Sequence, residues 1–111
     1  MPPKNSISEL EQLTLLAVAR LGDDGYGVTI RAQIEERAGH AVSIAAVYAA
    51  LDRMEGRGLL TSRTSDPVRQ RGGRARKHFI ISPAGETALR EARLRMERMW
   101  DGLSLDPEPI P

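Results

Sequence analysis

Residues 63–77 read Arg63-Thr64-Ser65-Asp66-Pro67-Val68-Arg69-Gln70-Arg71-Gly72-Gly73-Arg74-Ala75-Arg76-Lys77. Six basic residues stand here against one acid, around two glycines that permit the positive φ of a tight turn. The flanking segments, 59–64 and 77–81, have the composition of strands, so the region predicts an arginine-tipped β-hairpin. The formal net charge of the 111 residues is only +1. The positive charge is therefore local to this loop, which indicates a binding surface.

Three helical patterns precede the hairpin. Residues 6–21 begin with serine caps and acids and are apolar on more than one side, which predicts a helix shared between the core and a partner subunit. A second helix is expected from Tyr26-Gly27 to Gly39, after the turn at 22–25. Ser43 caps a third helix that ends near Gly56 and Gly58. Its predicted inward face consists of Ile44, Val47, Leu51 and Met54.

A fourth helix is predicted from about Ala84 to Leu103, after a Ser82-Pro83 cap. Its apolar residues alternate in steps of three and four, which is a heptad seam about two heptads long. The seam could pack onto its own domain, but we expect it to pair with a second copy, because the helices and strands before it already form a closed unit. Trp100 could line an inter-subunit pocket for a flat apolar effector, or simply pack in the interface. The predicted dimerisation residues are Leu10, Leu89, Ala92, Met96, Met99, Trp100 and Leu103.

These elements predict a mainly α fold with a small β-hairpin, a winged helix-turn-helix followed by a dimerisation helix. The expected division is a DNA-binding domain at 6–82 and a helix at 83–103, between flexible segments at 1–5 and 104–111.

The chain has no cysteine, no segment of signal-peptide character and no run of eighteen apolar residues. We therefore expect a cytoplasmic protein.

The third helix and the charged loop are the candidate DNA contacts. Small residues let a helix backbone approach a groove, and a tyrosine hydroxyl can donate to a phosphate. Alternatively, the alanines only favour helix formation and Tyr48 packs. Arginines beside a thin turn can enter a minor groove or contact phosphates, whereas a merely solubilising loop would mix charges. The predicted contacts are Ser43, Ala45, Ala46, Tyr48, Ala49 and Arg53 on the helix, with Arg69, Arg71, Gly72, Gly73, Arg74, Arg76 and Lys77 in the loop.

Catalytic and metal-binding patterns find little support. His40 and His78 are the only imidazoles and stand 38 positions apart, outside any ligand-spaced cluster. Asp23 and Asp24 lie in a glycine-flanked turn, where acids favour turn formation. The glycine pair is not followed by the Gly-Lys-Ser/Thr of a phosphate-binding loop. The chain is therefore predicted to be no enzyme and to carry neither a cofactor nor a metal.

Several segments, in order, resemble the PadR family of bacterial transcriptional regulators. They are Leu10–Leu16, Tyr26-Gly27-Val28, Ala46–Leu60, Gly72-Gly73-Arg74 and Ser82–Gly85. The resemblance implies a homodimer that binds a palindromic operator in double-stranded DNA, typically as a repressor released by a small molecule or stress signal. It also implies that Tyr48 is the recognition-helix tyrosine and that the glycine-arginine segment is the wing tip. A bacterial regulator of this kind is expected to associate with the nucleoid when it is bound to DNA.

The single C-terminal helix resembles the short branch of that family. Met96 and Trp100 occupy the region where some members hold aromatic ligands. The alternative is a winged helix that serves as a protein-interaction module, with its basic loop docked on an acidic partner.

Overall fold

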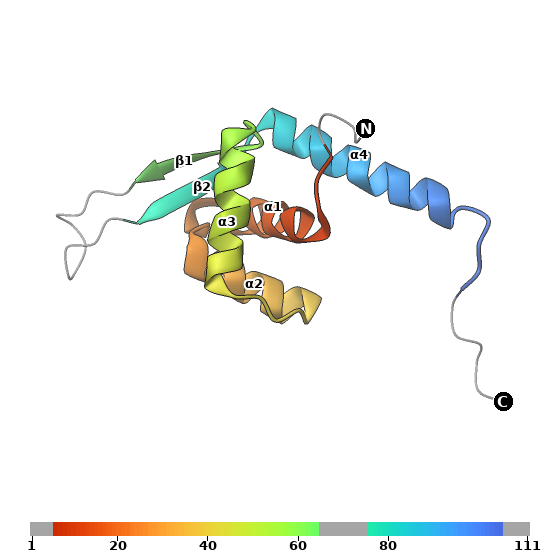
Figure 1. Ribbon diagram of the computed structural model, residues 1–111, viewed down its shortest axis with the longest axis horizontal. Coiled ribbons are helices and arrows are strands. Elements are labelled where there is room, and N and C mark those ends of the chain that lie inside the picture. The colour runs from red at the N-terminus through yellow and green to blue at the C-terminus, as the bar shows by residue number, and fades with distance from the viewer. Residues whose placement is uncertain (1–5, 65–75, 106–111) are drawn as a thin grey trace.

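The structure of the chain is a computed structural model that describes residues 6–64 and 76–105. Within these ranges, helices come first, an antiparallel hairpin follows, and a long helix ends the described chain (Figure 1). The elements are α1 (Glu9–Leu21), the 3-10 turn η1 (Gly22–Asp24), α2 (Gly27–Ala38), α3 (Ile44–Gly56), β1 (Leu60–Thr64), β2 (Lys77–Ile81) and α4 (Pro83–Trp100).

Serine caps start three of the helices, close to where the sequence predicts. The Ser8 hydroxyl accepts from the Glu11 N–H at 3.2 Å, and the Glu11 carboxylate accepts from the Ser8 N–H at 2.8 Å. This reciprocal pair satisfies two backbone donors that a helix start leaves unpaired. Ser43 and Ser82 cap α3 and α4 in the same way, without the return bond. Helix α4 ends three residues before the predicted Leu103, because the chain turns at Gly102 with φ of 81°.

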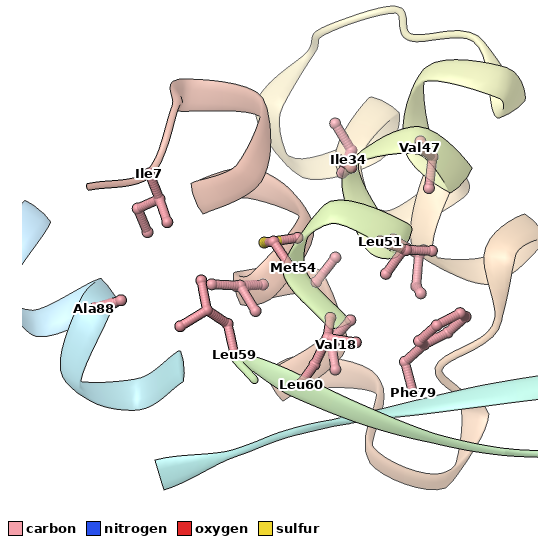
Figure 2. Packing of buried hydrophobic residues seen from close by; sticks show 14 of the residues in the cluster. Ile7, Val18, Ile34, Val47, Leu51, Met54, Leu59, Leu60, Phe79 and Ala88 are labelled. Atoms are coloured by element: carbon pink, nitrogen blue, oxygen red, sulfur yellow. The ribbon is translucent and has the colours of Figure 1, made fainter. Parts of the chain in front are cut away.

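One core joins all the elements (Figure 2). Phe79 of β2 lies against it from the sheet, and Val47, Leu51 and Met54 of α3 are completely buried. The predicted inward position of Ile44 is wrong, since this side chain is 37% exposed. Ile44 begins the first turn of α3, and Val42, ahead of the cap, packs against the core there instead. The remaining core residues are Ile7, Leu15, Ala17, Val18, Ile30, Ile34, Ala50, Leu59, Leu60, Ala88 and Ala92.

The hairpin is supported by more than its own two strands. Leu60 pairs with Ile81 and Thr64 with Lys77, in an antiparallel register. The turn before α2 adds a third partner, because Tyr26 forms an isolated bridge to His78. The Phe79 N–H also donates to the Gly25 carbonyl at 2.8 Å. The middle of β2 is thereby joined to the start of α2, which the sequence patterns did not predict.

Helix α4 has two halves with different surroundings. Its first turns pack closely, with Gly85 against the Leu59 backbone and Ala88 buried. Beyond Ala92 the helix extends away from the core, on the side opposite the hairpin (Figure 1). Of the helices in the described ranges, none has both the length and the apolar composition of a membrane span.

Candidate nucleic-acid interface

The outer flank of α3 is uncovered and made mostly of small side chains. Helix α3 lies across α1 and α2 with one side open (Figure 1). Ala45 and Ala49 are exposed there, while Ala46 is half-buried. Ser43 is exposed, and its hydroxyl accepts from the Ala46 N–H at 3.0 Å. A flank of this kind allows the helix backbone to approach a groove closely.

Tyr48 both packs and faces solvent. A Cβ placed on Gly27 would lie 2.3 Å from the Tyr48 ring, so the ring rests directly on the backbone that starts α2. The side chain nevertheless remains 43% exposed. Both interpretations of Tyr48 therefore describe part of its position, since the hydroxyl end of the ring contacts α2 while the side chain as a whole stays open to solvent. Only a glycine at position 27 allows this arrangement.

Contacts run continuously from α3 to the base of the wing. Tyr26 precedes Gly27, and the Arg76 guanidinium lies 4.6 Å over the centre of its ring. The His78 ring meets the edge of the same tyrosine at 5.6 Å between centroids. His78 Nδ1 also lies 3.1 Å from the Asp23 carbonyl oxygen. The start of α2 thus joins the exposed flank of α3 to a cationic side chain at the root of the loop.

The predicted wing tip lies outside the described part of the chain. Arg69, Arg71, Gly72, Gly73 and Arg74 lie outside the described residues. The strands that lead into it are described up to Thr64 and from Arg76 onward.

Two predicted DNA contacts have carboxylate partners. Arg53 Nε lies 3.4 Å from Glu11 on α1. Lys77 Nζ lies 3.0 Å from Glu55 on α3. A Ser62 hydrogen bond and the Lys77 ammonium hold the pKa of Glu55 below its usual value, so this carboxylate is charged at neutral pH. Arg53 and Lys77 thus each form an ion pair with a carboxylate of the same chain.

Sequence reasoning did not select Arg63, which is an exposed cation at the base of the wing. It pairs in register with His78, and its guanidinium lies 3.9 Å from the exposed Asp23 carboxylate. Strand alternation could have identified it, because Arg63 lies two residues from Thr61 on the exposed side of β1. In the part of the chain that the structure covers, no three metal-ligating side chains gather.

The predicted dimerisation residues fall into two groups. Leu10 and Leu89 are partly buried against the core, and Ala92 is only 4% exposed within the single chain. Met96, Met99, Trp100 and Leu103 are exposed. Between α1 and α4 lies an open groove of about 980 Å³, with Leu16, Leu89, Met96 and Trp100 among its lining residues. An exposed apolar surface of this kind on a small chain commonly marks an interaction site.

Comparisons with known proteins agree on the fold of this chain. A family model described as "Transcriptional regulator PadR-like family" matches residues 15–91. A PadR family transcription regulator from Clostridium difficile R20291 is similar in structure, at a TM-score of 0.68 and 24% identity, over 85% of this chain and 96% of that one. A PadR family regulator from Eggerthella lenta DSM 2243 reaches 0.65 and 25% identity, over 85% and 81%.

A third similar structure is Bacillus subtilis PadR in complex with operator DNA. Its TM-score is 0.63 at 19% identity, and the match covers 93% of this chain but 51% of that one. The comparison with curated proteins found no match.

Proposed function

This chain belongs to the PadR-like family of transcriptional regulators, and on that premise we propose that it is a homodimeric repressor that binds a palindromic operator. Members of this family are regulators of transcription and not enzymes. The proposal assigns DNA contact to the exposed flank of α3 and to the wing, and dimer formation to α4.

The observation that carries the proposal is the run of contacts from Tyr48 through Gly27 and Tyr26 to Arg76. It supports one binding surface in which the small residues of α3 and the root of the basic loop lie side by side. A helix with small residues can enter the major groove, while arginines of the adjoining wing contact phosphates or the minor groove. The operator complex of Bacillus subtilis PadR is consistent with this use of the fold.

Exposed apolar residues support the dimer. Beyond Ala92, α4 presents Met96, Met99 and Trp100 to solvent. Met96 and Trp100 line the groove between α1 and α4 together with Leu16. Covering this surface with a second copy would remove it from water. A two-fold dimer would also present two copies of α3, as a palindromic site requires.

We assign the binding of an effector that relieves repression to the groove between α1 and α4. Trp100, Met96 and Leu89 offer an apolar lining that suits a small flat molecule. A molecule bound there would compete with or reshape the packing of α4, and so change the spacing of the two recognition helices.

The proposed DNA-binding surface is tested by removing positive charges from the wing. Replacing Arg71, Arg74 and Arg76 with alanine is expected to weaken duplex binding at least tenfold. It should also reduce the slope of log K against log salt by about 0.9 for each lost phosphate contact. The duplex is obtained by selection from a random pool, which should return an inverted repeat, and affinity is titrated at several salt concentrations.

The control removes two positive charges from another part of the surface. Arg20 and Arg37 are exposed and line a small groove between α1 and α2. The Arg20→Ala/Arg37→Ala protein should bind within about twofold of the wild type and keep its salt slope. Equal slopes for the wing variant and the wild type would contradict the assignment. If no duplex is selected at all, the result favours the alternative function, in which the wing docks on an acidic protein partner.

A further inference from the structure

Glu55, near the end of α3, holds two groups of the hairpin at once. Its Oε1 lies 3.0 Å from Lys77 Nζ on β2, and its Oε2 accepts a hydrogen bond from the Ser62 hydroxyl on β1. One carboxylate therefore joins both strands of the wing to the recognition helix. We call these three residues the wing clamp.

The face of the hairpin explains why Lys77 points this way. Side chains alternate along a strand, so Lys77 shares the face of Phe79, which is buried against the core. Its Nζ lies 5.6 Å from the centre of the Phe79 ring. Ser62 is directly opposite Phe79 in the register and lies on the same face. The Lys77 ammonium is thus turned toward α3, whereas the guanidinium of Arg76, the residue before it, lies over the Tyr26 ring.

The clamp sits where it has most influence on the loop. Thr64–Lys77 is the last pair of the register before the loop, whereas Leu60–Ile81 is the pair at the opposite end of the hairpin. A two-stranded ribbon needs contacts with the rest of the fold to be held in place. Tyr26 contacts this end of the hairpin through His78 and Arg76, and the clamp joins the same end to α3, so the clamp helps to set the angle between the wing and α3.

We propose that Glu55 is a positioning residue for DNA binding, which sets the wing against α3 through Ser62 and Lys77, and that Lys77 anchors the wing instead of contacting phosphate. This inference rests on the proposed function, and it moves Lys77 from the predicted DNA contacts to the support beneath them. The wing and α3 must reach the duplex together, so loss of the clamp reduces affinity without removing a phosphate contact.

The experiment measures duplex affinity and its salt dependence for full-length variants. Glu55→Gln and Lys77→Met should each weaken binding by about threefold, as expected for one partly exposed ion pair. The salt slope should stay at the wild-type value in both. The double variant should bind no more weakly than either single variant, because both changes break the same contact.

Exchanging the charges of Glu55 and Lys77 distinguishes a Lys77 that anchors the wing from a Lys77 that contacts phosphate. In the Glu55→Lys/Lys77→Glu protein the net charge is unchanged and the pair can form again, so affinity should return to within about twofold of the wild type. A phosphate contact at position 77 predicts the opposite. Lys77→Met would then lower the slope by about 0.9, Glu55→Gln would tighten binding, and the exchanged pair would bind worst. Any of these three results overturns the inference.

Amide hydrogen exchange of the free protein tests the wing clamp independently of DNA binding. Amide hydrogen exchange at Thr64 and Lys77 should rise about threefold in Glu55→Gln, while the Leu60–Ile81 end of the hairpin stays protected. The matched control is Glu35→Gln, which breaks the similarly exposed Arg31–Glu35 pair at 3.1 Å on α2 and should alter neither exchange nor binding. Unchanged exchange in Glu55→Gln rejects the clamp. Wild-type protein that binds no duplex rejects the proposed function instead.

Discussion

Gly85 and Gly56 are both helical glycines, yet their surroundings are opposite. A Cβ on Gly85 would lie 2.0 Å from the Leu59 carbonyl oxygen, which belongs to the backbone and cannot rotate away. A Cβ on Gly56 would meet nothing within 4 Å. The first glycine is required by the docking of α4 on the chain just before β1, and the second only ends α3.

We expect the same substitution to have opposite effects at these two positions. Gly85→Ala should lower the free energy of unfolding by about 2 kcal/mol, because α4 must shift away from Leu59. Gly56→Ala should raise it by about 0.5 kcal/mol, because alanine reduces the freedom of the unfolded chain at an open helical position. Urea denaturation of both proteins measures the difference. Two changes of the same sign would contradict the packing described for α4.

At the scale of elements, α1 and α3 are joined by a carboxylate that is almost enclosed. The Glu11 side chain is 8% exposed and lies 3.4 Å from Arg53 Nε and 3.8 Å from Arg57. Burial by itself raises the pKa of Glu11, but hydrogen bonds from the Ser8 backbone and from Arg53 outweigh it and hold the pKa below 4.5. The same carboxylate caps α1 and orients Arg53 on α3.

This link should make stability depend on pH in a defined direction. The pKa of Glu11 is lower in the folded chain than in the unfolded chain, so the stabilising contribution is complete above pH 4.5 and is lost as the pH falls through the folded value. Glu11→Gln should therefore be less stable than the wild type at pH 7, and the gap should narrow below pH 4.5. Urea denaturation between pH 7 and pH 3 measures it.

Glu9→Gln is the control for that series, since Glu9 is exposed in the same turn of α1. It should change the free energy of unfolding at pH 7 by less than about 0.5 kcal/mol. A Glu11→Gln protein whose stability runs parallel to the wild type at every pH would show that the carboxylate is not coupled to folding.

At the scale of the whole molecule, the single tryptophan reports on the proposed dimer. Trp100 ends α4 and is exposed within one chain, as is Met99, which is 74% exposed. If a second copy covers this end of the helix, Trp100 moves from water to an apolar environment. Its fluorescence maximum should shift to shorter wavelength as the protein concentration rises, in step with the mass from sedimentation equilibrium.

Met99→Glu tests that assignment without touching the core. A buried carboxylate without a partner would oppose pairing strongly, so the variant should remain a monomer at concentrations where the wild type is dimeric. Its thermal unfolding should stay cooperative, because Met99 makes no part of the core of the single chain. A Met99→Glu protein that dimerises like the wild type would place the interface elsewhere.

Much of the fold follows from local chemistry in the chain. Serine caps at Ser8, Ser43 and Ser82 start helices within a residue or two of the predicted positions, because a cap acts on the backbone next to it. The strands were likewise predictable, since both segments contain β-branched or aromatic residues that favour strands. The exposure of Ile44 was not predictable, because the helix period assigns this residue to the inward face, whereas Val42, ahead of the cap, packs against the core.

The residue types of the site were also present in the sequence, namely small side chains on α3 and cations near the hairpin. Their partners were not. Glu11 precedes Arg53 by 42 positions, and Glu55 and Lys77 stand on different elements, so no periodic pattern links them. The third partner of the hairpin, at Tyr26, was hidden for the same reason.

The sequence by itself therefore determined where helices and strands begin, which faces are apolar, and where positive charge is concentrated, because each depends on neighbours along the chain. Only the tertiary structure decided which cations form ion pairs within the chain, where Tyr48 packs, and how the start of α2 contacts both α3 and Arg76. Those properties arise from contacts between residues distant in sequence, whose geometry exists only after the core has packed.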